Sequence, residues 1–251
     1  MRNFKLPIVL ILVTGLLSFT ISKGFLINQK GFSRVRDAIT EKESLVIKNL
    51  SNHGIKPEES NILFTVFKEE NEFNIYAKKK SDESYKKIAT YEICESSGEL
   101  GPKRKQGDLQ VPEGFYHINR FNPMSSFHLS LGLNYPNASD RIKSKYSNLG
   151  GDIFIHGDCV TIGCMPMTND KIKEIYLYSI FAKNNGQTKI PVYVFPFKMT
   201  DKRIDEYKYM HDDTHEIVSF WHNIKKGYDQ FHANKKELKF SINQKGDYLF
   251  K

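Results

Sequence analysis

The chain has few cysteines, and their spacing does not suggest a metal centre. Its 251 residues include only Cys94, Cys159 and Cys164. A second Cys-x-x-Cys motif is missing, so a structural zinc module is not expected. His211 and His215 have the i, i+4 spacing of a helical metal site, but the glutamate of a His-Glu-x-x-His motif is absent. We therefore expect neither a metal nor another cofactor.

Two missing motifs limit the possible cellular locations and binding partners of the protein. No Leu-x-x-Cys lipobox precedes Cys94, which argues against a lipoprotein anchor. The formal net charge is +8, yet no helix-turn-helix, RNA-recognition or zinc-finger pattern accompanies it, so nucleic acid is not the expected partner. A basic surface also suits an anionic polymer such as the cell wall, although a solvated face explains the charge equally well.

The N-terminus carries a targeting pattern. Arg2 and Lys5 precede an apolar run from Leu6 to Ile21. A basic stretch followed by such a run is typical of a signal peptide or a short membrane anchor over residues 1–22. The run is slightly short for a bilayer span. We expect export to the periplasm or cell envelope, with cleavage and inner-membrane attachment through residues 6–21 left open.

The periodicity predicts an α+β protein in three parts after residue 22. Many short alternating segments followed by helices favour a mostly antiparallel sheet with peripheral helices. A C-terminal stretch from 201 to 235 has an aromatic i, i+3/i+4 stripe and is expected to be a long helical region. The expected parts are a linker and helix over 23–59, a catalytic domain over 60–199, and a helical extension over 200–251.

The segment 151–167 carries the clearest chemistry. An apolar, β-branched run leads to His156, and seven residues later Gly163 begins a Gly-Cys pair with Cys164 in a small-residue turn. A thiol is a good nucleophile only as the thiolate, and a neighbouring imidazole can accept its proton. The pattern therefore predicts a strand that presents a base and a loop that presents a nucleophile. The alternatives are a buried core cysteine and a hydrogen-bonded core histidine.

The order of motifs in this chain resembles the L,D-transpeptidase (YkuD-type) catalytic domain, and most closely its YafK-type murein branch. The resemblance rests on His156-Gly157 followed by Thr161-x-Gly163-Cys164, and on three earlier motifs. These are the segments 97–102, 111–116 and 134–138. It implies a YkuD-type β-sandwich, a role in the cell wall and in cell shape, and peptidoglycan stem peptides as the substrate.

The resemblance also assigns roles around the two reactive groups. In the family, a local carbonyl or hydroxyl orients the imidazole, so the carbonyl of Gly157 takes that role here. Thr161 occupies the Ser/Thr position and would support the loop. The backbone N–H groups of Gly163 and Cys164 are the natural donors to an oxyanion. The odd number of cysteines leaves at least one thiol unpaired, and a disulfide between Cys159 and Cys164 would silence the nucleophile.

The substrate-binding groups are harder to predict. The family signature continues with a small apolar residue and then Arg or Asn, whereas Met165, Pro166 and Met167 follow the cysteine here. Lys103, Arg104 and Lys105 lie in the glycine-rich stretch 98–112 and are candidates to bind stem-peptide carboxylates, although a charge run is more often a solvated face.

These features predict an exported cysteine acyltransferase. Its Cys164 would form a thioester with a stem peptide, and an amine would then resolve that thioester. Hydrolysis at the same site, cutting stem-peptide or wall-protein links, is the first alternative. A non-catalytic wall-binding module is the second.

Overall fold

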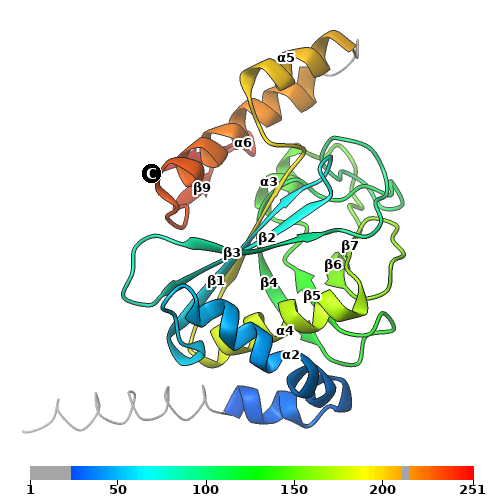
Figure 1. Cartoon of the computed structure of the whole chain (residues 1–251). Coiled ribbons are helices and arrows are strands. Elements are labelled where there is room, and N and C mark those ends of the chain that lie inside the picture. Colours follow the sequence, from blue (N-terminus) through cyan, green and yellow to red (C-terminus); the bar gives the residue numbers. More distant parts are fainter. Residues whose placement is uncertain (1–23, 211–214) are drawn as a thin grey trace, which may run out of the picture.

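The computed structural model describes residues 24–210 and 215–251, and within them a mixed eight-stranded sheet forms the centre of the molecule. Figure 1 shows the sheet curling between helices that lie on both of its sides. Its strands are β1 Ser60–Phe67, β2 Glu72–Lys79, β3 Lys86–Glu92, β4 Gly114–Asn122, β5 Ser130–Leu133, β6 Phe154–His156, β7 Met165–Pro166 and β8 Ile190–Phe195.

The sheet order brings distant segments together. The strands run β3-β2-β1-β8-β4-β5-β6-β7. The β1–β8 and β6–β7 pairs are parallel, and the remaining neighbours are antiparallel. The alternating segments 62–67 and 73–77 form a hairpin, in which Phe64 of β1 pairs with Ile75 of β2. The parallel β6–β7 pair at one edge brings together the two sequence segments that carry the histidine and the cysteine.

One face of the sheet is covered by α2 Ser33–Ser51 and α4 Asn169–Asn184. Helix α4 begins where the sequence predicts, because the Thr168 hydroxyl caps it by accepting from the N–H of Lys171. The side chains of α2 and α4 bury themselves against alternate residues of β1, whose inward set includes Ile62, Phe64 and Val66. This larger core supports the strands that lead to the site.

The opposite face is covered by α6 His215–Asn234 and a separate hairpin of β9 Phe240–Ile242 and β10 Tyr248–Phe250. Trp221 and Phe231 of α6 are fully buried against the sheet. Gly227 allows the close approach of this helix, because a Cβ there would lie 2.6 Å from ring atoms of Phe115 and Phe250. The aromatic stripe in the sequence therefore does pack on the body.

The remaining helices are short. They are the 3₁₀ turn η1 Pro57–Glu59, α3 Ala138–Lys143 and α5 Asp201–Met210. Two side chains cap the N-terminus of α3 reciprocally. The Asn137 side chain accepts from the N–H of Asp140, and the Asp140 carboxylate accepts from the N–H of Asn137. Burial raises the pKa of Asp140 to about 6, although Arg104 beside it acts in the opposite direction.

Three expectations about the fold need correction. The fold is α+β, but the strands form one curled mixed sheet plus a hairpin, not a clear antiparallel sandwich. The predicted linker at 23–33 contains a helix over residues 24–30. The C-terminal stretch is two helices followed by the hairpin, not one long helical region. Hydrophobic periodicity reports which residues are buried, and it does not report whether buried faces belong to one sheet or two.

Residues 1–22, where the sequence predicts a signal peptide or anchor, lie outside the described residues. In the part of the chain that the structure does describe, no helix has both the length and the apolar character needed to cross a membrane.

Both edge strands of the large sheet have features that disfavour pairing with a strand of another molecule. The edge strand β3 exposes Lys86 and Lys87 to solvent. The other edge strand, β7, is two residues long, and Pro166 in it has no N–H to donate.

Candidate active site

The site is built at the β6–β7 edge of the sheet. Ile155 of β6 pairs with Met165 of β7, and His156 pairs with Pro166. Since β7 begins directly after Cys164, the cysteine lies beside β6, and the N–H of Phe154 points at its sulfur at 3.4 Å. His156 follows Phe154 at the strand period of two, so both side chains face the same side. The sheet thus brings the histidine and the cysteine to one place.

His156 is held as a neutral base. It is 2% exposed, and its Nδ1 hydrogen-bonds to the carbonyl oxygen of Gly157. A carbonyl can only accept, so Nδ1 carries the proton and Nε2 is left as the acceptor. The ring lies against Phe127, with 4.8 Å between ring centroids. Burial lowers the pKa of His156, although the Gly157 carbonyl acts in the opposite direction.

Cys164 is a free, half-buried thiol. Burial raises its pKa above the ordinary value of 9.0, while the Phe154 N–H and the Lys103 ammonium favour the thiolate. The carbonyl of Asp152 lies 3.6 Å from the sulfur. At neutral pH the resting pair is therefore a thiol beside a neutral imidazole, so proton transfer must accompany attack.

Thr161 organises the turn before the nucleophile. Its hydroxyl oxygen accepts from the N–H of Gly163 at 3.1 Å and from the N–H of Cys164 at 2.8 Å. The same hydroxyl donates to the carbonyl of Cys164 at 2.9 Å. Gly163 has a φ of +129°, a conformation that favours glycine. In this arrangement the two N–H groups predicted to bind an oxyanion donate to Thr161.

The cysteine pairing differs from the one considered from the sequence. Cys94 and Cys159 form a disulfide, with 5.6 Å between their Cα atoms, and Cys164 keeps its thiol. Cys159 is therefore not available to silence the nucleophile or to act as a thiolate ligand. Cysteine spacing alone could not identify this pair, because its members are 65 residues apart in sequence.

Cys164 lies between two cavities. One, of about 480 Å³, is lined by His156, Cys164, apolar side chains that include Phe127 and Ile162, and polar side chains that include Asp152. The other, of about 320 Å³, is lined by Cys164, Leu100 and several charged side chains. Those charged residues are Lys68, Glu69, Glu95 and Glu99. The nucleophile can thus be approached from the side of His156 and from a second side that carries several carboxylates.

The three basic residues proposed for substrate binding lie elsewhere. Lys103 is 5% exposed, and its ammonium pairs with Asp108 at 2.5 Å. Arg104 pairs with the buried Asp140 at 2.9 Å. Lys105 lies over the ring of Tyr146 at 5.4 Å. In the described part of the chain, neither cavity at Cys164 is lined by any of the three.

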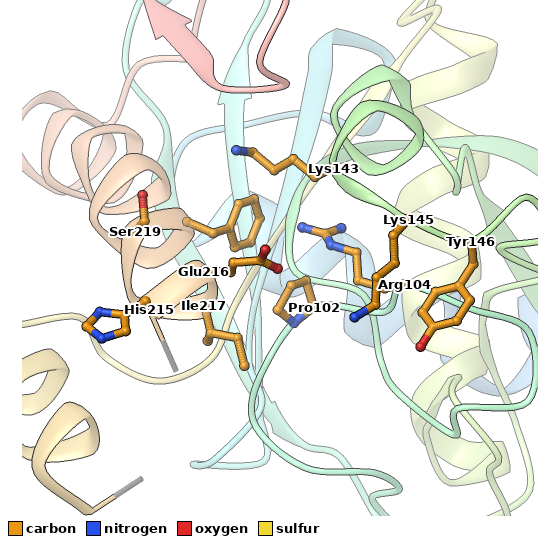
Figure 2. Close-up of a pocket in the computed structure, with 10 residues that line it drawn as sticks. Pro102, Arg104, Lys143, Lys145, Tyr146, His215, Glu216, Ile217 and Ser219 are labelled. Atoms are coloured by element: carbon orange, nitrogen blue, oxygen red, sulfur yellow. The ribbon is translucent and has the colours of Figure 1, made fainter. Parts of the chain in front are cut away.

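Arg104 instead faces a third cavity, of about 610 Å³, between the segment 102–104, residues 143–146 and the start of α6. Figure 2 shows its guanidinium beside Lys145 and Tyr146, with Glu216 across the cavity. The guanidinium carbon is 5.0 Å from the centre of the Phe220 ring. These contacts fix Arg104 to the C-terminal helix.

Some residues of the site carry no motif of their own. Phe127, from a segment expected only to be a strand, covers the imidazole. Asn169 at the start of α4 accepts from the N–H of Asp158 at 2.9 Å. A Cβ at Gly157 would overlap that Asn169 side chain and the Phe127 carbonyl, so glycine is required there for space. An alternation of apolar residues could not reveal these contacts, because they join loops to other elements.

A free thiol and an imidazole with an accepting nitrogen face one cavity, an arrangement that is chemically suited to acyl transfer. Residues 63–194 match the family model of the L,D-transpeptidase catalytic domain, YkuD. The chain belongs to this family.

Two curated relatives agree with that assignment. The chain is 38% identical over 185 residues to YafK of Escherichia coli strain K12, which carries the provisional name of L,D-transpeptidase. The match covers 73% of this chain and 71% of YafK, and YafK of strain O157:H7 matches equally. The crystal structure of the helical cell shape determining protein Pgp2 from Campylobacter jejuni is 20% identical, with a TM-score of 0.44 over 78% of this chain and 80% of that one.

Proposed function

We propose that this protein is an exported cysteine acyltransferase that acts on the stem peptides of peptidoglycan. The observation that carries the proposal is the shared cavity of His156 and Cys164, together with the hydrogen bond from Nδ1 to the Gly157 carbonyl. That bond leaves Nε2 as the only acceptor of the ring, and we assign it the role of receiving the thiol proton. Membership of the L,D-transpeptidase family supplies the substrate class.

The reaction follows from the two groups. Nε2 of His156 takes the proton from Sγ of Cys164 as the sulfur attacks an amide carbonyl. The imidazolium then gives its proton to the leaving amine, and a thioester remains on Cys164. An incoming amine, deprotonated by the neutral imidazole, displaces the thiol and forms the cross-link. Thr161 holds the loop, and an oxyanion bound by the N–H groups of Gly163 and Cys164 would replace the Thr161 hydroxyl as their acceptor.

Hydrolysis is the second candidate, favoured by one observation. The family's Arg or Asn position, the second after the cysteine, is filled here by Pro166, which is buried in β7. Its side chain offers no ligand to a substrate carboxylate. A thioester with a poorly held acceptor is resolved by water, which would make the protein an amidase of stem-peptide or wall-protein links.

The export proposed here rests on residues 1–22 and on the cell-wall substrates of the family. The predicted carboxylate-binding role of Lys103, Arg104 and Lys105 gains no support from their positions, since two of the three are in ion pairs.

The deciding experiment incubates wild type and Cys164→Ala with disaccharide-tetrapeptide, followed by intact-protein mass spectrometry and chromatography of the products. We expect an acyl adduct on the wild type only, with cross-linked dimers as products. Shortened or released peptides without dimers would establish the hydrolase instead. Equal processing by Cys164→Ala would refute the enzymatic proposal. No adduct and no product from the wild type, with the free Cys164 thiol confirmed by titration, would favour a wall-binding module.

A further inference from the structure

The loop that carries Cys164 has little to hold it in place. The hydrogen bonds of its central residues stay inside the loop, as between the N–H of Val160 and the carbonyl of Asp158. Its apolar tips are open to solvent: Val160 is 54% and Ile162 is 79% exposed. A loop of this kind gains little from burial, so its conformation requires another constraint.

Cys94 supplies a constraint on both sides of the nucleophile. Through the disulfide it is bonded to Cys159, five residues before Cys164. Through its backbone N–H it donates to the carbonyl of Pro166, two residues after Cys164, at 3.1 Å. The preceding N–H, of Ile93, donates to the carbonyl of Asn71 in the β1–β2 turn at 2.7 Å. One residue therefore ties the chain before and after the nucleophile to the rigid β1–β3 part of the sheet.

We propose that the Cys94–Cys159 disulfide is a positioning device for the reaction, which holds the sulfur of Cys164 in line with His156. The inference rests on the function proposed above and extends it to a pair of residues that do not touch the substrate. A displacement of about 1 Å at a nucleophile costs up to about 10²-fold in rate. Loss of the tether should thus reduce turnover more than substrate binding, whose contacts come from many residues around two cavities.

The test uses the double variant Cys94→Ser/Cys159→Ser in the full chain. Both cysteines are replaced because a single substitution would leave a second free thiol close to Cys164. We expect kcat to fall at least about tenfold with KM nearly unchanged. We also expect alkylation of Cys164 by iodoacetamide at pH 8 to become faster, because a loosened loop exposes the thiol. Unfolded molecules would also combine slow turnover with fast alkylation, so both rates are measured on double-variant protein whose circular dichroism spectrum and urea midpoint show that it is folded.

Two controls separate positioning from stability. Gly227→Ala places a methyl group against Phe115 and Phe250 on the opposite face of the sheet, so it should lower stability and leave both rates unchanged. Treatment of the wild type with a phosphine, which reduces the disulfide to two thiols and takes up oxygen from water, should reproduce the double variant. The same treatment of the double variant should change nothing.

The proposal is overturned if the folded double variant keeps the wild-type kcat and alkylation rate. The alkylation measurement needs no peptidoglycan substrate. If the wild type showed no turnover, the proposed function would fail while the alkylation rates still reported whether the tether positions the thiol.

Discussion

The buried carboxylate of Glu113 ties the glycine-rich loop to both the sheet and the C-terminal helix. Its Oε1 accepts from the ammonium of Lys68 at 2.9 Å and from the N–H of Gly101 at 2.8 Å. Its Oε2 accepts from the indole N–H of Trp221 at 2.7 Å. The side chain of Glu113 is 0% exposed and that of Lys68 is 8% exposed. This is a nearly dry ion pair in which every carboxylate oxygen is satisfied.

Replacing Glu113 by Gln is therefore expected to be severe. The substitution keeps the shape but leaves the Lys68 ammonium buried without a counter-ion, and it turns an amide group towards at least one donor. Breaking a buried ion pair from one side costs about 3–5 kcal/mol. Against a total stability of about 5–15 kcal/mol, this is a large fraction. The carbonyls of Glu99 and Val111 also accept from Lys68, so we expect the lower end, about 3 kcal/mol.

The assay is urea unfolding followed by fluorescence and by circular dichroism. Trp221 is the only tryptophan of the chain, and it contacts the changed residue directly. The matched variant is Lys68→Met, and the double variant removes both charges. Because the double variant leaves no unpaired charge, it should be more stable than the sum of the single changes predicts, by at least about 1 kcal/mol. A loss below about 1 kcal/mol for Glu113→Gln, or strict additivity, would refute the reasoning.

Three other predictions concern the site and its surroundings. Alkylation of Cys164 should keep accelerating beyond pH 9, because burial raises the pKa of this thiol above 9.0; a rate plateau near pH 7 would instead indicate a resting thiolate. Thr161→Val should lower kcat about tenfold or more, because the turn that positions Cys164 loses the three hydrogen bonds of the Thr161 hydroxyl; unchanged kcat would show that the hydroxyl is dispensable. Burial raises the pKa of Asp140 to about 6 from 3.8, so the folded state binds the proton more tightly. The wild type should then lose up to about 3 kcal/mol of unfolding free energy as the pH rises from about 4 to 6. Asp140→Asn should lack this loss, and equal urea midpoint profiles for both proteins would contradict it.

The sequence indicated the reactive pair because its signal is local. His156, Gly163 and Cys164 lie within one short segment that forms a specific sequence motif. A strand followed by a tight loop can be predicted from residues that are close together in the sequence. The structure brings these residues together at one edge of the sheet. Gly157 was also identifiable, since its carbonyl acts on the adjacent residue.

Features that depend on distant contacts were not predictable in the same way. The disulfide joins residues far apart in the chain, and an odd cysteine count does not say which pair forms. Lys103 looked like a surface charge among other charges, but its partner Asp108 draws it into the protein. The helix over 24–30 has no clear apolar stripe, so its residues resembled a linker. In each case tertiary packing decides, and a periodic pattern does not encode it.

The short, charged edges of the large sheet affect how the protein behaves among its own copies. An unpaired strand is a template on which a second molecule can add its own strand and begin an aggregate. Here one edge presents the ammonium groups of Lys86 and Lys87, and the other ends at Pro166 after two residues. The edge with the nucleophile therefore stays open to a substrate while it offers no continuous row of backbone groups to a neighbouring sheet. The two-residue strand β7 therefore both leads from the nucleophile and limits pairing of this sheet edge with another copy of the chain.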